Sequence, residues 1–161
     1  MTASVETLRA AIKAKIVAVA SIGTVHDYER YLKDQSRLAT LYVNTAQTGS
    51  RVYGWNIRRV RTVEQLVSTG RNYQDHYWRI RGYMSLEDAD GTEKLFDIQI
   101  EAIRDAFRAD PTLGNICDTH FNEQNAGQGG VQLEEHEPVL FCGVLCHGAR
   151  LGLITRVYTN T

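Results

Sequence analysis

Two segments in which apolar and arginine residues alternate constrain the fold most. Residues 51–63 are rich in β-branched and aromatic residues, with Trp55 among those that share one parity, and this pattern predicts a strand. Residues 75–86 alternate as well, with Trp78 on an apolar face and arginines and tyrosines on the other. With residues 64–74 as a turn region that contains Gly and Asn, the two segments predict a long antiparallel hairpin.

Two helices are predicted from apolar residues that recur at three- and four-residue spacing. The first covers residues 3–20, with Ser4 as its N-cap and Gly23 at its end. The second covers residues 93–109, where Thr92 is expected to cap the first turn. The apolar stripe of this second helix consists of Leu95, Phe96, Ile100, Ile103 and Phe107.

Three other segments have weaker patterns. Residues 25–31 are predicted as a short strand or an extended connection. Residues 34–43 fit either a short helix or a strand. A stretch at about 114–130 is rich in Asn, Gln and Gly, and this composition predicts a long flexible loop.

The last segment completes the predicted fold. Residues 131–159 predict two strands, bent at Gly143 or Gly148. The order of elements then favours an α+β fold with a mainly antiparallel sheet, on which the N-terminal and central helices pack beside the long hairpin 51–86. We expect one domain over residues 1–161. The side chains expected to face its core from the last two strands are Leu145, Leu151 and Leu153.

The near-neutral net charge of −1 hides two oppositely charged segments. Residues 51–86 hold seven arginines and two acids, whereas residues 87–137 hold thirteen acids and three bases. Opposite charges on one chain favour self-association, because the basic surface of one copy can meet the acidic surface of the next. The alternative is that the two segments neutralise each other within a single copy.

No sequence motif predicts catalysis, and we expect no enzyme activity, no cofactor and no metal. The patterns GxSxG, GxxxxGK[ST], GxGxxG and HExxH are absent. Cys117, Cys142 and Cys146 are an odd, sparse set, so buried packing is favoured over disulfides, and any further role for them stays open. The longest apolar run, residues 16–22, is too short to span a membrane, and we expect neither a membrane nor a signal peptide.

Nucleic acid binding is one function that the hairpin allows. Arginines next to tyrosines on a sheet are typical of proteins that bind single strands. However, the chain is mildly acidic, with a pI of about 6.5, and only four of its eighteen basic residues are lysines. Because the planar fork of arginine also suits protein interfaces, a small nucleic-acid-binding module remains an alternative.

Several local patterns, taken in order, point to a family. They are "VHDYERY", "GWNIRRV", "HYWRIRGYMSLEDADGTEKLFD", "IQIEAIRDAFRADPTLGN" and "HGARLGLITRVY", after an Ala-rich first helix. This layout, across most of the chain, resembles the tail terminator (tail completion) proteins of tailed bacteriophages. None of these patterns is a catalytic motif.

The resemblance implies a structural virion protein of the tail or neck, assembled in the host cytoplasm. Its copies would form a closed ring, typically of six, that caps the tail tube and stops its growth. The ring would contact the tail tube protein and the neck, connector or head-completion protein, and DNA would pass through it without specific recognition. The flexible loop would become ordered on contact with a subunit of the tube or neck. Another neck or head–tail joining protein is a further alternative.

Candidates for the subunit contact come from both charged segments. Because Arg58 and Arg59 are adjacent on a strand and point to opposite faces, only one of them need lie at an interface. Glu134 and Glu135 are likewise expected on opposite faces, whereas Glu135 and Glu137 share one. The full set of candidates is Arg51, Arg58, Arg59, Arg61, Arg79, Arg81, Glu134, Glu135 and Glu137.

Overall fold

The computed structural model describes residues 3–44, 51–118, 121–122 and 128–160. The chain has an α+β fold, as predicted, built on a mixed sheet with the strand order β1-β3-β4-β8-β7. The sheet is mixed because β1 pairs parallel with β3, whereas the other paired strands are antiparallel. Its strands are β1 (Thr24–His26), β2 (Val43–Asn44, beside β3), β3 (Arg51–Ser68), β4 (Arg71–Ser85), β7 (Gln132–Phe141) and β8 (Val144–Asn160).

The first helix, α1 (Val5–Val17), is shorter than predicted. Ser4 is its N-cap, and the Ser4 hydroxyl accepts a hydrogen bond of 3.1 Å from the Thr7 backbone N–H. Gly23 does not end the helix. It comes after the helix, at φ +82°, where a Cβ atom would lie 2.6 Å from the backbone oxygen of Tyr53. Gly23 therefore lets the chain pass close to the sheet.

Strands β3 and β4 continue through the region predicted as a turn. Cross-strand pairing extends from the body of the sheet to Leu66, opposite Asn72, and to Ser68, opposite Arg71. The prediction of a turn over residues 64–74 was therefore wrong, because only two residues connect the strands. Gly70, at φ +79°, takes the left-handed conformation that this tight connection needs.

The second long helix, α3 (Thr92–Arg108), follows a short 3₁₀ helix at Asp88–Asp90. Its buried stripe faces the sheet, where Phe96 stacks on Trp55 with 5.4 Å between ring centroids. Leu95 was predicted in that stripe but is 48% exposed. Thr92 does not cap the helix either. Its hydroxyl lies 2.8 Å from Nε2 of buried His147, and Gly91 is the N-cap.

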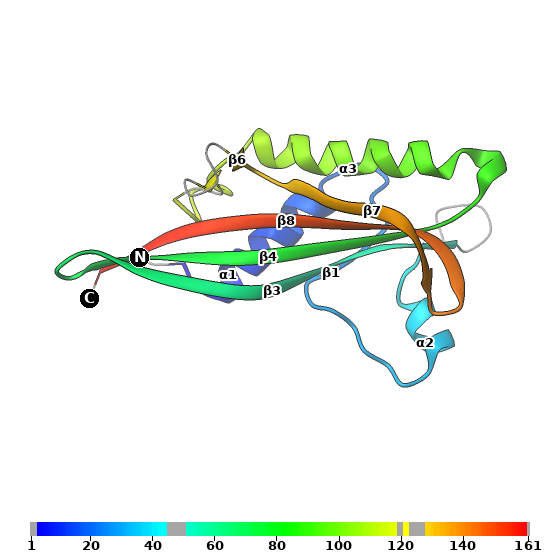
Figure 1. The fold of residues 1–161 in the computed structure, drawn as a ribbon, viewed down its shortest axis with the longest axis horizontal. Coiled ribbons are helices and arrows are strands. Elements are labelled where there is room, and N and C mark those ends of the chain that lie inside the picture. Colours follow the sequence, from blue (N-terminus) through cyan, green and yellow to red (C-terminus); the bar gives the residue numbers. More distant parts are fainter. Residues whose placement is uncertain (1–2, 45–50, 119–120, 123–127, 161) are drawn as a thin grey trace.

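Helices α1 and α3 cover the same face of the sheet (Figure 1). The core between them and the sheet contains Trp55 and Trp78, which are at most 2% exposed. Each indole N–H has a partner: Trp55 donates to the Ile22 carbonyl and Trp78 to the Thr155 hydroxyl, both at 2.9 Å. The main hydrophobic core therefore lies on one side of the sheet and leaves few polar groups unpaired.

The described residues cover the opposite face at one end only. There, α2 (Gln35–Thr40) and β2 follow each other, which resolves the segment predicted as either helix or strand. A small cluster of Tyr42, Val52 and Cys146 packs beneath them, with Tyr42 edge-on to Phe141. Figure 1 shows α2 on the side of the sheet away from α3.

A two-residue turn joins β7 and β8. Cys142 and Gly143 have φ angles of +52° and +78°, so Gly143 lies in the turn between the strands rather than at a bend within one. Leu151 and Leu153 are buried, as predicted. Leu145 is 52% exposed, and its prediction as a core residue was wrong, because it lies next to the turn, outside the core that packs under α1 and α3.

The segment predicted as a flexible loop at about 114–130 lies partly outside the described residues. In its described part Cys117 is buried, and the Asp118 backbone N–H donates to the Arg156 carbonyl at 2.9 Å. Two short strands, β5 (Phe121–Asn122) and β6 (Gln128–Gly129), pair with each other. Because residues 119–120 and 123–127 are not described, the flexibility of this loop stays a prediction.

Candidate interaction surface

The sheet face away from α1 and α3 carries most of the candidate residues. Residues directly opposite on antiparallel strands have their side chains on the same face. The register pairs Arg58 with Arg79, Arg81 with Arg150, and Arg150 with Glu135. We call this surface the arginine face; it consists of Arg58, Arg61, Tyr77, Arg79, Arg81, Arg150, Glu134 and Glu135, with Glu29 above it.

A bulge in β3 decides which arginines belong to this face. The register shifts between Arg59, opposite Trp78, and Arg61, opposite Tyr77. The extra residue, Val60, reverses the alternation beyond it. Alternation alone would give both Arg59 and Arg61 the parity of Trp55, but the bulge leaves only Arg59 with it. The Arg61 guanidinium instead lies 4.1 Å from the ring centroid of Tyr77, on the arginine face.

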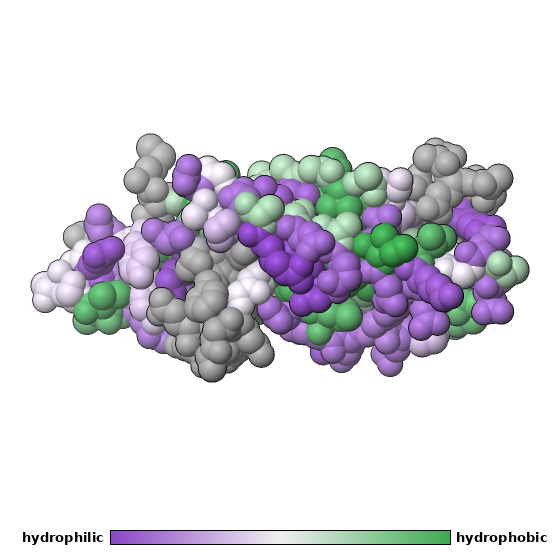
Figure 2. Space-filling model, turned by 90° about the horizontal axis from the view of Figure 1, so that it is seen from above, coloured by the Kyte–Doolittle hydropathy of each residue, from purple (hydrophilic) through white to green (hydrophobic). Residues whose placement is uncertain are grey.

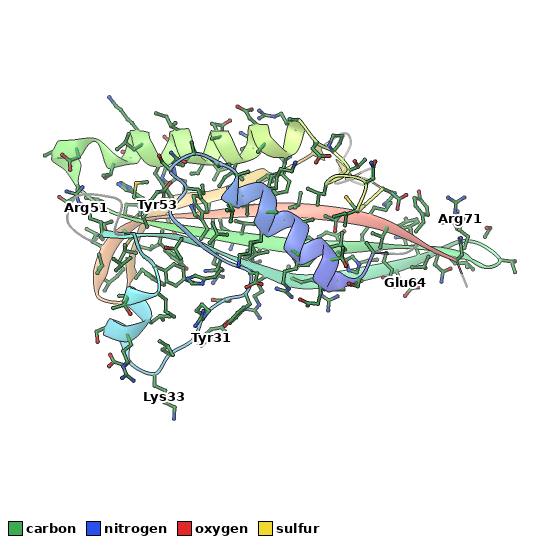
Figure 3. All side chains as sticks on the ribbon, turned by 180° about the vertical axis from the view of Figure 1, so that it is seen from behind. Tyr31, Lys33, Arg51, Tyr53, Glu64 and Arg71 are labelled. Atoms are coloured by element: carbon green, nitrogen blue, oxygen red, sulfur yellow. The ribbon has the colours of Figure 1, made fainter. Side chains whose placement is uncertain are left out.

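Glu29 joins two of these arginines. Its two carboxylate oxygens lie 3.1 Å from Nη1 of Arg58 and 3.2 Å from Nη1 of Arg81. The Glu29 side chain is only 18% exposed. It comes from the connection between β1 and α2, where Tyr31 and Lys33 also lie (Figure 3). A hydrogen bond with Glu29 raises the pKa of Tyr31, whose side chain is 71% exposed.

A second charge network lies at the β7 edge of the arginine face. Arg150 Nε is 3.0 Å from a Glu134 oxygen, and Arg150 Nη2 is 2.7 Å from a Glu135 oxygen. The two acids were predicted on opposite faces. Both reach Arg150 because the register of β7 shifts between Leu133 and Glu135, which leaves Glu134 as an extra residue.

Arg79 lies between these two networks. It stands opposite Arg58 on β3 and opposite Gly152 on β8, and its side chain is half-buried. Among the described residues Arg79 has no ion pair, in contrast to Arg58, Arg81 and Arg150. Gly152 adds no side chain beside it, so the Glu134 carboxylate lies over Gly152 instead.

Arg51 and Arg59 do not belong with this group, and Glu137 lies at its edge. Arg51 lies at the other end of β3 from the hairpin tip that carries Arg71 (Figure 3), and its Nη1 is 2.9 Å from an Asp90 oxygen. Arg59 lies on the covered side. Burial lowers the pKa of His76, and the positive charge of Arg59 lowers it further. Glu137, on β7 opposite Gly148, shares a face with Glu135, as predicted, and lies beyond the Arg150 network.

The basic segment is therefore partly neutralised within one copy. The alternative of internal neutralisation holds for Arg51, which pairs with an acid of residues 87–137. The hairpin acid Asp75 is paired from outside both segments, because its two oxygens each lie 2.8 Å from the guanidinium of buried Arg156. Sequence patterns missed Glu29, Arg150 and Arg156, because each meets its partner across strands or connections that are distant in the chain.

The shape of the arginine face does not favour a small-molecule site. A hollow of about 180 Å³ lies on it, lined by Arg81, Tyr83, Glu135, Val139 and Arg150, among others. Sites for drug-sized ligands usually measure 300–1,000 Å³ and are mostly apolar. A broad surface of half-exposed arginines and tyrosines is instead typical of contacts with macromolecules.

The cysteines have no geometry for metal binding in the described part of the chain. Burial raises the pKa of Cys117 to about 12 and that of Cys146 to about 11, so both thiols keep their protons at neutral pH. Cys142 lies in the β7–β8 turn. Within the residues that the structure covers, no three His, Cys, Asp or Glu side chains are grouped to hold an ion.

Comparisons with known proteins add no relative. No protein-family model matches the chain, and no significant match exists among curated protein sequences. Among the described residues, no helix has the length and apolar character to cross a membrane.

Proposed function

We propose that this chain is a structural virion protein that acts as a phage tail terminator. Copies of the chain form a ring, most simply of six, that caps the tail tube and stops its growth. The ring offers its other surface to the neck or head-completion protein, and DNA passes through it without specific recognition. The protein is assembled into virions in the host cytoplasm and works without an enzyme activity or a cofactor.

The observation that carries this proposal is the contrast between the faces of the sheet. One face is buried under α1 and α3, while the arginine face stays open over its middle. Its central side chain, Arg79, has no ion pair among the described residues. Glu29 already holds Arg58 and Arg81 in place, so less side-chain entropy is lost when a partner binds. These properties support a protein interface.

A closed ring also needs two unlike surfaces on each copy. The arginine face is one candidate, and its complement would be acidic. Acids lie on α3 at Glu93 and Asp97, and just before the helix at Asp88, on the other side of the sheet from the arginines. The positive arginine face and the acidic surface at α3 therefore lie on different sides of one copy, as a head-to-tail contact requires.

The first test is to image the purified protein by negative stain and to measure its mass over a range of concentrations. Rings support the proposal, and a monomer at every concentration contradicts it.

The second test compares Arg79→Glu with Arg59→Glu, which reverse the same charge on opposite sides of the hairpin. We expect Arg79→Glu alone to weaken assembly while both variants fold. Assembly lost only in Arg59→Glu would move the contact to the other side.

The two alternatives are a nucleic-acid-binding module and another neck or head–tail joining protein. One observation favours the nucleic-acid-binding module. Arg61 stacks on Tyr77 near Arg79, which has no ion pair in the described part of the chain, as in proteins that bind single-stranded nucleic acid. Fluorescence anisotropy with labelled DNA at rising salt separates this function, because phosphate contacts weaken steeply with salt. Adding the protein to purified tail tubes separates a terminator, which caps tube ends, from another neck or head–tail joining protein, which does not.

A further inference from the structure

Two edges of the sheet are open in the described part of the chain. β7 ends the strand order on one side, and on the other side β1 and β2 pair with β3 only as far as Asn56. No residue of β7, or of β3 from Arg58 to Ser68, is fully buried. Figure 2 shows apolar residues only as separate groups among hydrophilic ones on the side seen from above. Open strand edges, whose N–H and C=O groups can bind another strand, are therefore the clearest contact surfaces.

The two edges carry opposite charge on the arginine face. At the β3 edge, Arg61 has no ion pair in the described part of the chain, and Arg58 shares its acidic partner with a second arginine. At the β7 edge, Glu135 shares Arg150 with its neighbouring acid, and Glu137 has no ion pair among the described residues. Charge therefore remains on both edges after the ion pairs within one copy are counted. Unlike edges attract each other, whereas like edges repel.

The direction of the strands allows copies to continue one sheet. The pairs β3–β4, β4–β8 and β8–β7 are all antiparallel, so β3 and β7 run in opposite directions. When a second copy is placed beside the first in the same orientation, its β7 is antiparallel to the β3 of the first. The arginine face then stays on one side of the continued sheet, as copies related by rotation in a ring require.

The spacing of these charges fits one register. Because of the bulge in β3, Arg58 and Arg61 stand opposite residues of β4 that are two positions apart, and Glu135 and Glu137 are two positions apart on β7. In an antiparallel pair, Arg61 then faces Glu135 of the next copy and Arg58 faces its Glu137. The same register ends alike on both strands: β1 occupies the edge of β3 just before Arg58, and Pro138, after Glu137, has no N–H to donate.

The register also sets how far neighbouring copies are displaced along the strands. Within one copy Glu137 is level with Gly54, through Gly148 and Tyr83, and Gly54 lies four residues before Arg58. Placing Glu137 beside Arg58 of a neighbour therefore shifts each copy by ~13 Å along the strands over ~19 Å across them. The resulting strand tilt of about 35° is close to that of sheets that close on themselves.

We infer that β3 of one copy pairs with β7 of the next copy, so that the sheets of neighbouring copies continue into one another. Backbone hydrogen bonds join the two open edges, and Arg58 and Arg61 face Glu137 and Glu135 across the junction. This inference rests on the proposal that copies of the chain form a ring, and it names the strands that join them. Arg79 stands opposite Arg58, so its charge also acts at this junction.

A disulfide between copies tests the register. Residues opposite each other on antiparallel strands have Cβ atoms about 4.5–5.5 Å apart, near enough for a disulfide after a small shift. In a Cys142→Ser background, where Cys117 and Cys146 are buried, Arg61→Cys with Glu135→Cys should give on oxidation a covalent ladder that ends at the ring. Within one copy β4 and β8 separate the two positions by about 14 Å, so no internal disulfide can form.

The matched control moves one cysteine to the neighbouring residue. Thr62 follows Arg61, but its side chain lies on the other face of β3, where its hydroxyl is 2.8 Å from Nδ1 of His76. Thr62→Cys with Glu135→Cys in the same background should assemble without giving the ladder. Non-reducing gels of both variants, after assembly is checked under reducing conditions, measure the difference.

A charge exchange tests the same contact without cysteines. Arg61→Glu and Glu135→Arg each place like charges across the junction, so each alone should raise the concentration needed for assembly by about fivefold or more. Both changes in one chain restore opposite charges and should recover most of this loss. Sedimentation velocity over a range of concentrations compares these variants with the unchanged protein.

The outcomes separate this inference from the proposed function. A ladder from Arg61→Cys with Glu135→Cys that the control does not give supports the junction. If the unchanged protein assembles but this variant gives no more ladder than the control, the junction is overturned and the ring proposal stands. A double charge variant that assembles no better than the single ones also overturns the junction. If the unchanged protein is monomeric at every concentration, both the ring proposal and the junction fail.

Discussion

Alternate residues of β4 belong to two different environments. Trp78 and Ile80 point into the core and are at most 2% exposed. Arg79 and Arg81, directly beside them in the chain, point to the arginine face and stay half-buried. The period of two in a strand creates this contrast, since each step turns the side chain to the other face.

The contrast separates the residues that hold the fold from those available to a partner. The covered face buries large apolar side chains, which supply most of the stability of a domain. The arginine face holds partly exposed ion pairs, which solvent screens, so they contribute less to stability than the packed core. The following four changes test this division, from the largest expected loss of stability to the smallest.

The largest loss is expected for Trp78→Ala. It leaves a cavity in the core and removes the donor to the Thr155 hydroxyl, so the free energy of unfolding should fall by about 3–5 kcal/mol. The adjacent change Arg79→Ala should stay within about 0.5 kcal/mol. Urea denaturation followed by tryptophan fluorescence or circular dichroism measures both. Equal losses in the two variants would contradict the division between the faces.

A buried ion pair tests whether a residue with the parity of Arg79 can contribute strongly to stability when it is buried. Asp75 and Arg156 are both about 3% exposed, although Asp75 shares the parity of Arg79. Asp75→Asn leaves the Arg156 charge buried without its carboxylate partner and should cost about 3 kcal/mol. The double variant Asp75→Leu with Arg156→Met removes both charges and should recover most of this loss in the same urea measurement. If Asp75→Asn leaves the free energy of unfolding unchanged, water reaches the pair.

Two Gly→Ala substitutions, each of which adds one methyl group, also compare the covered face with the arginine face. A Cβ atom on Gly82 would lie 2.3 Å from the Trp55 ring, so Gly82→Ala should destabilise the fold by about 1–3 kcal/mol. On Gly152 it would meet the Glu134 carboxylate at 2.4 Å, and that flexible side chain can move away. Gly152→Ala should therefore change stability by less than about 0.5 kcal/mol. Thermal melting of both variants, side by side, checks the difference.

A smaller loss than that of Gly82→Ala is expected for Glu29→Gln. It removes the carboxylate that joins Arg58 and Arg81, which are 53% and 33% exposed, so the loss should stay below about 1 kcal/mol. Salt should shrink the difference further, because exposed charges are screened. Urea denaturation at low and high salt measures both effects. A loss that does not depend on salt would mean that Glu29 acts through packing.

The periodic parts of the fold could be predicted from the sequence. The alternation in β4 and the apolar stripe of α3 identified both elements, because each pattern extends over several repeats. Leu95 and Leu145 were assigned to the core by the same patterns and are exposed. Periodicity gives the direction of a side chain but not whether another element covers it.

The arginine face could be predicted only in part. Arg79 and Arg81 were placed correctly, but the bulges at Val60 and Glu134 changed the faces of Arg61 and of the acids on β7. A bulge adds one residue without a clear sequence signal. Glu29 and Arg150 were missed because their partners lie on other elements, and contacts of that kind have no local pattern.

The position of β8 has a consequence for how the chain folds. This strand pairs with β4 on one side and β7 on the other, yet it is the last strand in the described sequence. As the chain is synthesised, β4 therefore has an unpaired edge until β8 emerges. Pairing between such distant segments is slow, because a long loop must close before any contact forms. The arginines that alternate along β4 place charge along this unpaired strand, and charged side chains disfavour its pairing with other chains before β8 is synthesised.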